Sequence, residues 1–203
     1  MLASAWHKMR PVRTLPALAL ALAAGCAHGP AATATGARPS DYFPLAVGNE
    51  WVFVDRSPQL SPAEQAVRER KVRILSRDAE GFFHDSSRGE LRVDADCLRD
   101  RLRRLLCAPF ETGRRWISVV SVSSTERYEI VAVGERVTTP AGTFHGCIRV
   151  RAHNRAGPDT DQVLETTYAP GVGVVRLETF VVVKGAMTPQ VKAELKSYRL
   201  EGK

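Results

Sequence analysis

Apolar and polar residues alternate with a period of two over most of residues 41–203. Trp51 and Phe53, for example, occupy alternate positions of one such segment. A period of two is that of a β-strand with one buried face. Further segments of this kind are 70–75, 90–95, 116–124, 128–137, 147–154, 162–169, 173–183 and 191–200. Together they predict an all-β domain of about nine or ten strands, joined by short turns rich in Gly, Pro, Asn and Asp.

One short segment departs from this alternation. Ser61 precedes Pro62, and Glu64 follows three positions after the serine. A serine cap, a proline at the first helical position and a glutamate three residues on are signals of a helix start. We therefore expect one short helix at residues 62–68, which leaves the all-β class unchanged.

A motif of proline, glycine and tryptophan occurs twice with the same spacing. The two copies are Pro44, Gly48 and Trp51, and Pro109, Gly113 and Trp116. In each copy the proline stiffens an extended entry, and the next apolar residue covers the edge of the sheet. The glycine permits a reversal of the backbone, so the tryptophan begins a strand and points inward. A recurring local solution and an internal duplication both account for the two copies.

Two further blocks of proline and glycine predict sharp bends. They are Pro140, Gly142 and Phe144, and Pro170, Gly171 and Gly173. The first block predicts a tight turn whose phenylalanine folds back on the sheet, and the second predicts a bend or bulge in a strand. Such bends are needed where a single antiparallel sheet curves into a half-barrel or barrel-like shape around a core or a cavity.

Four segments carry a resemblance to a known family. They are "YFPLAVGNEW" (42–51), "APFETGRRW" (108–116), "VTTPAGTFHGCIRV" (137–150) and "YAPGVGVVRLE" (168–178). In this order they resemble the bacterial lipoproteins of the TapB family, near the DUF3108-like domains of unknown function. The resemblance implies an exported, lipid-anchored β domain, a tetratricopeptide-repeat protein as partner, and no catalytic residue. Cys97 and Cys107 depart from the family pattern.

The first 25 residues have the features of a lipoprotein signal peptide. Lys8, Arg10 and Arg13 form a positive region, and a short apolar run over 15–24 leads to Cys26. The run is about ten residues long, whereas a membrane-spanning helix needs about 20. A buried N-terminal helix is the alternative, and the flanking charges disfavour it. Residues 22–26 resemble a bacterial lipobox, with Ala23 where Leu is commonest, so we expect Cys26 to carry the lipid.

The remaining chain divides into a tether and one domain. Residues 26–40 are small, with Pro and Gly and almost no large apolar group, and are expected to form a flexible lipidated tether. Residues 41–203 are long enough for one domain with its own core. Ala27 follows the acylated cysteine, where Asp would favour retention in the inner membrane. We therefore expect a lipid anchor in the outer membrane of the cell envelope, facing the periplasm.

Net charge gives no support for a nucleic-acid partner. The formal net charge is +7 at pH 7, and the mature chain keeps +4 because the signal peptide contains three cations and no acid. No stripe of Arg or Lys interleaved with aromatic residues is present, so no nucleic acid is expected. Residues 99–104 are the densest basic run and alternate with leucines. A charged outer face of a strand or hairpin is favoured there over an anion site.

Residues with catalytic or metal-binding potential are scattered singly. His145 and Cys147 would share one side of a strand as a thiol and base pair, but no third residue orients them. Neither His84 nor His153 has a metal-ligand spacing to a second ligand. Other polar candidates are Asp94 and Asp96, which lack the remaining ligands of a calcium loop, the turn residues Asp159 and Asp161, and Gly134, Gly142 and Gly146, which form no phosphate loop. We expect no enzyme, cofactor or metal.

The number and positions of the cysteines predict one disulfide. Three thiols remain after acylation of Cys26, and the periplasm is oxidising. Cys97 and Cys107 flank "LRDRLRRLL", which can turn back as a hairpin and bring the two side chains together. Cys147, inside an expected strand, is left as a buried free thiol.

Two functions remain open. The first is a non-catalytic protein-interaction or scaffolding module that docks a periplasmic protein. The alternative is a binder or carrier of an apolar ligand, such as a lipid, in the concavity of the sheet. An interior filled by Trp51, Trp116 and Phe144 favours the first, and an open cavity lined by Leu, Val and Phe favours the second.

The lipobox predicts the mature N-terminus. We expect the wild-type chain to begin at an acylated Cys26 and to partition with membranes, because buried acyl methylenes each add about 0.8 kcal/mol of membrane affinity. A Cys26→Ser variant removes the acylated thiol and should stay unprocessed, as measured by intact mass. Unchanged processing and membrane partition of this variant would refute the prediction.

Overall fold

A computed structural model describes residues 33–34 and 36–201. Contacts divide the chain into two units, Met1–Pro30 and Ala31–Lys203, of which the second contains all of these residues. The predicted signal peptide and Cys26 lie outside the described residues.

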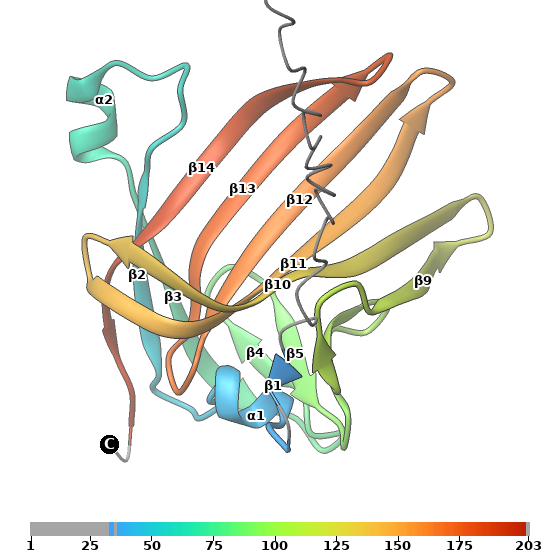
Figure 1. Ribbon diagram of the computed structural model, residues 1–203. Coiled ribbons are helices and arrows are strands. Elements are labelled where there is room, and N and C mark those ends of the chain that lie inside the picture. The colour runs from blue at the N-terminus through green and yellow to red at the C-terminus, as the bar shows by residue number, and fades with distance from the viewer. Residues whose placement is uncertain (1–32, 35, 202–203) are drawn as a thin grey trace, which may run out of the picture. The chain divides into compact units, whose positions relative to one another are not determined.

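The described part of the chain is almost entirely β-structure (Figure 1). Its elements are, in chain order, β1 (Thr33–Ala34), α1 (Pro39–Tyr42), β2 (Glu50–Asp55), α2 (Pro62–Val67), β3 (Glu69–Arg77), β4 (Phe83–Asp85), β5 (Glu90–Val93), β6 (Cys97–Arg99), β7 (Arg104–Cys107), β8 (Phe110–Glu111), β9 (Arg115–Ser121), β10 (Ser124–Thr139), β11 (Gly142–Gly157), β12 (Thr160–Ala169), β13 (Gly173–Val183) and β14 (Ala186–Arg199). No helix in these described ranges is long and apolar enough to cross a bilayer.

Twelve of the described strands form one antiparallel sheet. Their order is β7-β6-β5-β4-β3-β2-β14-β13-β12-β11-β10-β9. The predicted all-β class and the single curved antiparallel sheet are confirmed, whereas the predicted number of about nine or ten strands is too low. The missed strands lie mostly in residues 83–107, where β4, β6 and β7 have only three or four residues each. Such short strands show too few alternations for a period to be recognised.

Both short helices begin with a proline. In α2, the Ser61 side chain accepts a hydrogen bond from the Glu64 backbone, and the Glu64 carboxylate accepts one from the Ser61 backbone. The predicted helix at 62–68 is therefore present, one residue shorter than expected. The other helix, α1, begins inside the segment predicted to be a tether, and Thr33–Ala34 pairs there with β8.

The two copies of the Pro-Gly-Trp motif build the same turn. Gly48 and Gly113 have φ of 99° and 89°, values that favour glycine, and each occupies the third position of a turn. The glycine N–H donates to the carbonyl of Ile74 in one copy and of Ile130 in the other. Both isoleucines are buried on the neighbouring strand. Each turn thus fixes where a strand begins and which strand it pairs with.

Each motif tryptophan joins its strand to a second element. Trp51 Nε1 donates to the Val172 carbonyl at 2.7 Å, and Trp116 Nε1 donates to the Arg104 carbonyl at 2.7 Å. The first contact depends on Gly173, because a Cβ there would lie 3.3 Å from Trp51 Nε1. Gly173 also has a φ of 109°. The 170–173 block therefore forms the turn on which Trp51 closes one end of the sheet.

The hairpin of β10 and β11 bends over the outer face of the sheet. Register shifts at Gly134 and Gly146 mark the bend. Its tip reaches β14, where the Ala141 N–H donates to the Leu195 carbonyl and the ring of Phe144 lies 6.3 Å from that of Tyr198. The 140–144 block is thus a tight turn whose phenylalanine contacts the sheet.

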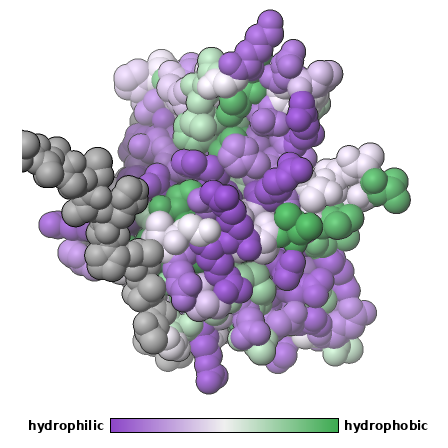
Figure 2. Space-filling model, turned by 45° about the vertical axis from the view of Figure 1, so that its right-hand side comes forward, coloured by the Kyte–Doolittle hydropathy of each residue, from purple (hydrophilic) through white to green (hydrophobic). Residues whose placement is uncertain are grey.

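Outside this covered region the surface is mostly hydrophilic (Figure 2). On the outer face the nearly buried Glu165 carboxylate pairs with Arg149 and Arg151. Two arginines of the basic run 99–104 also pair with carboxylates: Arg99 contacts Asp94, and Arg101 contacts Asp78 and Glu90. These ion pairs agree with a charged outer face.

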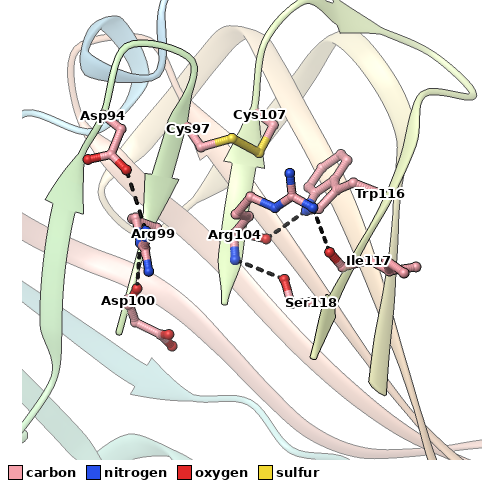
Figure 3. The surroundings of a disulfide bond; sticks show 9 residues. All are labelled: Asp94, Cys97, Arg99, Asp100, Arg104, Cys107, Trp116, Ile117 and Ser118. Carbon is pink, nitrogen blue, oxygen red and sulfur yellow. Dashed lines mark hydrogen bonds and ion pairs between the residues drawn. A yellow bond between two sulfur atoms is a disulfide. The ribbon is translucent and has the colours of Figure 1, made fainter. Parts of the chain in front are cut away.

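The two edges of the sheet meet through side chains. Arg104 of β7 donates its backbone N–H to Ser118 Oγ at 3.0 Å and a guanidinium N–H to the Ile117 carbonyl at 2.7 Å (Figure 3). The Trp116 indole completes the seam from the side of β9. Side-chain hydrogen bonds therefore replace a backbone ladder between β7 and β9, and the sheet is nearly closed.

A disulfide lies next to this seam. Cys97 of β6 and Cys107 of β7 are paired in register and form a bond with an S–S distance of 2.11 Å (Figure 3). Cys147 is a free, buried cysteine. The disulfide ties the seam strand β7 to its neighbour β6.

Loss of the disulfide should lower the stability of the fold. A Cys97→Ser, Cys107→Ser double variant is expected to lose about 2 to 3 kcal/mol of unfolding free energy, because the bond closes a short loop in the unfolded chain. Urea unfolding measures this change. A Cys147→Ala variant, which keeps the disulfide, is the control for cysteine replacement, and an unchanged midpoint in the double variant contradicts the prediction.

Candidate functional site

The inner face of β10 to β14 forms a concave surface with a polarity gradient. Residues directly opposite each other on neighbouring strands share a face. Their register defines three successive rows: Glu126, Asn154, Gln162 and Val181; Tyr128, Ala152, Leu164 and Thr179; and Ile130, Val150, Thr166, Leu177 and Ala193. The rows change from mostly polar near the hairpin ends to mostly apolar near the base of the sheet.

A cavity of about 650 Å³ lies over the first two rows. Tyr128, Ala152 and Leu164 line it from the sheet, and Leu105 of β7 lines it from the opposite side. Its polar groups are mainly uncharged amides and hydroxyls, from Asn154, Gln162, Thr166, Thr179 and Gln190. A volume of this size is in the range of small-molecule sites, about 300–1,000 Å³.

Next to this cavity, at the base of the sheet, lies a mostly apolar pocket. This pocket, about 190 Å³, shares Leu105 and Tyr168 with the larger cavity. Its aromatic lining residues are Phe43, Trp51, Phe53 and Tyr168, and its charged lining residues are Arg70 and Asp85. A third cavity, about 570 Å³, shares Phe53 and Leu177 with the pocket and extends toward α2. We call this series of three adjacent cavities the groove.

A charged cluster lies at the polar end of the groove, in the largest of its three cavities. Arg103 Nε lies 3.0 Å from Glu126 Oε1, and Arg103 Nη1 lies 3.2 Å from Asp100 Oδ2. The Tyr128 hydroxyl donates to Glu126 Oε2 at 2.5 Å. The Tyr128 ring stacks on Trp116 with a centroid distance of 5.4 Å. Two carboxylates therefore share one guanidinium at the polar end of the groove.

The pKa values of Tyr128 and Arg103 in this cluster are both raised. Burial, together with the hydrogen bond to Glu126, raises the pKa of Tyr128 well above its usual value. Burial acts to lower the pKa of Arg103, but the hydrogen bonds and charges of Glu126 and Asp100 outweigh it, and the pKa is raised. At neutral pH Tyr128 stays a neutral donor and Arg103 a cation. The cluster suits positioning of a polar group better than proton transfer.

The expected pair of His145 and Cys147 is separated by a bulge. Cys147 pairs with Glu135 and Phe144 pairs with Val137, so β11 contains one extra residue between them, at a Gly146 with φ of 70°. The extra residue shifts the alternation of side chains. As a result His145 is exposed and Cys147 is buried, and the expectation that they share one side of the strand was wrong.

The other two histidines lie apart from Cys147. His84 Nε2 is 3.0 Å from Asp78 Oδ2, and its Nδ1 is 3.5 Å from Glu90 Oε1, in a partly exposed cluster with Arg101. His153 borders a separate shallow depression with Arg127. Among the described residues no group of three His, Cys, Asp or Glu side chains is arranged for a metal.

The acidic and glycine candidates have structural roles. Asp94 binds Arg92 and Arg99, and the Asp96 carbonyl accepts the Ala108 N–H. The Asp159 carbonyl accepts the Lys184 N–H. Asp161 borders the depression that also contains His153. Gly134 and Gly146 are bulge positions, and Gly142 closes the tight turn of the hairpin.

The groove residues themselves were missed as a site. Period-two alternation indicates that Glu126 and Tyr128 share a face, but only the curvature of the sheet brings Arg103 and Leu105 opposite them. Arg103 was interpreted as part of a charged outer face, yet it lines the cavity. The alternation of Leu102 and Leu105 with arginines was the only signal in that segment.

Comparison with known proteins gives no family assignment. No family model and none of the curated proteins match the chain. One similar solved structure is a candidate lipoprotein from Parabacteroides distasonis ATCC 8503, with 13% identity over 77% of this chain and 97% of that chain, at a TM-score of 0.43. Another is a candidate exported protein with a YmcC-like fold from Bacteroides fragilis NCTC 9343, with 14% identity over 79% and 99%, at a TM-score of 0.44.

Likeness at this level supports no statement about fold or function. Membership of the TapB family stays a prediction.

The free thiol should be unreactive in the folded protein. Burial, and then the charge of Glu135, raise the pKa of Cys147 to about 11. At pH 8 alkylation by iodoacetamide should be at least about 100-fold slower than in urea, because only the thiolate reacts. Intact mass gives the rates. The stabilisation from the protonated thiol is present below pH 9 and is lost as the pH rises toward 11, since the unfolded chain releases its proton first. Equal rates in the folded and unfolded states contradict the prediction.

Proposed function

We propose that the chain is a non-catalytic, lipid-anchored protein of the bacterial cell envelope that holds an apolar ligand, such as a lipid, in the groove. The observation that carries the proposal is that a large cavity with polar groups lies directly beside a mostly apolar pocket. Leu105 and Tyr168 line both the cavity of about 650 Å³ and the apolar pocket of about 190 Å³. Apolar surface lining a concave site favours burial of an apolar group.

The polarity of the groove indicates which part of a ligand binds where. Aromatic and aliphatic side chains around Trp51, Phe53 and Leu177 suit a hydrocarbon chain. At the other end, uncharged amides and hydroxyls offer hydrogen bonds, and carboxylates outnumber the single guanidinium of Arg103. We therefore expect an amphipathic ligand whose head is uncharged or positively charged.

The positions of the large aromatic residues favour ligand binding over a purely structural interior. Trp51 and Trp116 are buried and donate hydrogen bonds at the margins of the groove. Phe144 packs against Tyr198. None of these three side chains fills the larger cavity. The expected scaffolding role, with a periplasmic protein such as a tetratricopeptide-repeat protein as partner, stays a prediction, as do the outer-membrane anchor and its orientation toward the periplasm.

The absence of catalysis is also part of the proposal. At the polar end of the groove, Arg103 and Tyr128 are held by an ion pair and a hydrogen bond to Glu126. The exposed His145 is separated from the buried Cys147 by the Gly146 bulge. A nucleophile would need a base and an orienting neighbour. Binding and release, without turnover, are the expected activity.

A polar substitution inside the groove should weaken binding. We expect the uncharged probe N-phenyl-1-naphthylamine to bind the wild-type protein with increased fluorescence, and Leu177→Gln to raise its Kd about tenfold, which corresponds to about 1.4 kcal/mol of lost apolar contact. Fluorescence titration gives the Kd. Mass spectrometry of organic extracts of the purified protein should detect a co-purified lipid.

Leu75→Gln is the matched control, because Leu75 is an exposed leucine outside the groove lining. It should leave the Kd unchanged. Thermal unfolding of both variants shows whether Leu177→Gln acts through folding. Absence of probe binding by the wild-type protein, or equal Kd values for the two variants, would sink the proposal.

A further inference from the structure

The hairpin of β9 and β10 carries apolar side chains on its outer face. Ile117 and Val119 are 53% and 65% exposed, and Val122 in the turn is fully exposed. Figure 2 shows apolar surface, in green, on the projection at the right of the view, the side on which Figure 1 draws β9. Among the described strands, β9 ends the sheet and pairs only with β10. Exposed apolar side chains gathered at one projection mark an interaction surface.

Polarity changes in steps along this hairpin. Val122 is at the tip, Val119 lies opposite Thr125, Ile117 lies opposite Arg127, and Arg115 lies opposite Glu129. The tip is therefore apolar, the middle combines an apolar residue with a cation, and the base is charged. A protein segment that enters the boundary between acyl chains and headgroups has this order, with apolar groups deepest and arginines at the level of the phosphates.

The arginines near the hairpin have cationic groups available. Within residues 33–34 and 36–201, neither Arg127 nor Arg155 forms an ion pair with an acidic side chain. They border a shallow depression of about 340 Å³ on the outer face, together with Arg115, His153, Glu129 and Asp161. The guanidinium of Arg155 donates to the carbonyls of Gly157 and Pro158, and both arginines are exposed. Neither positive charge is neutralised by a carboxylate, so both attract anionic phosphates, which arginine binds through N–H donors.

From these observations we propose that the β9–β10 hairpin docks on an anionic lipid surface. Val119 and Val122 enter the boundary between headgroups and acyl chains, and Arg127 and Arg155 contact lipid phosphates. The placement of this surface near the bilayer rests on the proposed lipid anchor. Apolar burial and electrostatic attraction then act together, as in other interfacial segments.

The position of the hairpin favours a membrane over a protein partner. Cys26 precedes Thr33 by seven residues, which span at most about 25 Å. Thr33 pairs with β8, and residues 112–114 connect β8 directly to β9. The seven residues of β9 extend about 20 Å from this point. An anchor at Cys26 thus holds the bilayer within the reach of the hairpin tip.

Depth-dependent quenching tests the proposal. The lipidated protein, with Val122→Cys labelled by the fluorophore NBD, is reconstituted into vesicles of phosphatidylethanolamine and phosphatidylglycerol. We expect nitroxides on the lipid acyl chains to quench this label at least about twofold more than a label at Lys184→Cys on the β13–β14 turn. Lys184 is an exposed position on another hairpin, so both labelled proteins share the same anchor.

Charge and apolar variants separate the two contributions. Arg127→Gln combined with Arg155→Gln should reduce quenching at residue 122 in vesicles with phosphatidylglycerol and have little effect in pure phosphatidylcholine. Val119→Ser should reduce it in both, with the label still at position 122. Equal quenching at residues 122 and 184 overturns the proposal. Cross-linking of residue 122 to an envelope protein, without quenching by lipid, also overturns it and identifies a protein-docking surface.

Separate measurements distinguish failure of the hairpin proposal from failure of the groove or of the anchor. Intact mass establishes whether Cys26 is acylated, and probe binding tests the groove. A protein without an acyl chain, added to the same vesicles at low salt, should still show quenching at residue 122. If the label at residue 122 of this non-acylated protein is not quenched, the proposal that the hairpin docks on lipid is overturned.

Discussion

The unpaired backbone groups on the two edges of the sheet constrain this structure most. An antiparallel sheet presents unpaired N–H and C=O groups along its first and last strands. Here the edges belong to β7 and β9. Arg104 joins them by donating to Ser118 and Ile117 and by accepting from Trp116. Joining the edges requires the sheet to curl, and the curl creates the groove. The disulfide between Cys97 and Cys107 fixes one side of this seam.

The groove remains open because the elements that enclose it are held at its margins. Trp51 closes the base of the sheet through its hydrogen bond to Val172, and Gly173 leaves room for the indole. The β10–β11 hairpin covers the outer face of β14 and does not enter the concavity. Ion pairs such as that between Arg149 and Glu165 lie on the outer face. Each margin is therefore stabilised without a side chain that fills the centre.

Local chemistry in the sequence predicted much of this fold. Alternation gave strands such as β2 and β12, the capping box at Ser61 gave α2, and proline and glycine gave the turns before Trp51 and Trp116. The short strands between residues 83 and 107 were missed because three or four residues carry no recognisable period. His145 and Cys147 were assigned to one side because a bulge shifts the alternation without a strong signal beyond Gly146. The groove could not be predicted, since it depends on which distant strands face each other across the curl.

Strand β10 connects the two proposed sites through its alternation. Glu126 and Tyr128 line the groove, whereas Arg127 and Glu129 border the depression on the outer face. Consecutive residues of one strand thus face the groove on one side and the proposed lipid-contact surface on the other. Ion pairs hold this strand on both faces. Arg103 pairs with Glu126 on the groove side, and Arg115 of β9 pairs with Glu129 on the outer side. A ligand that displaces Arg103 from Glu126 would alter the strand that also presents Arg127, so occupancy of the groove and contact with a bilayer share a common structural element.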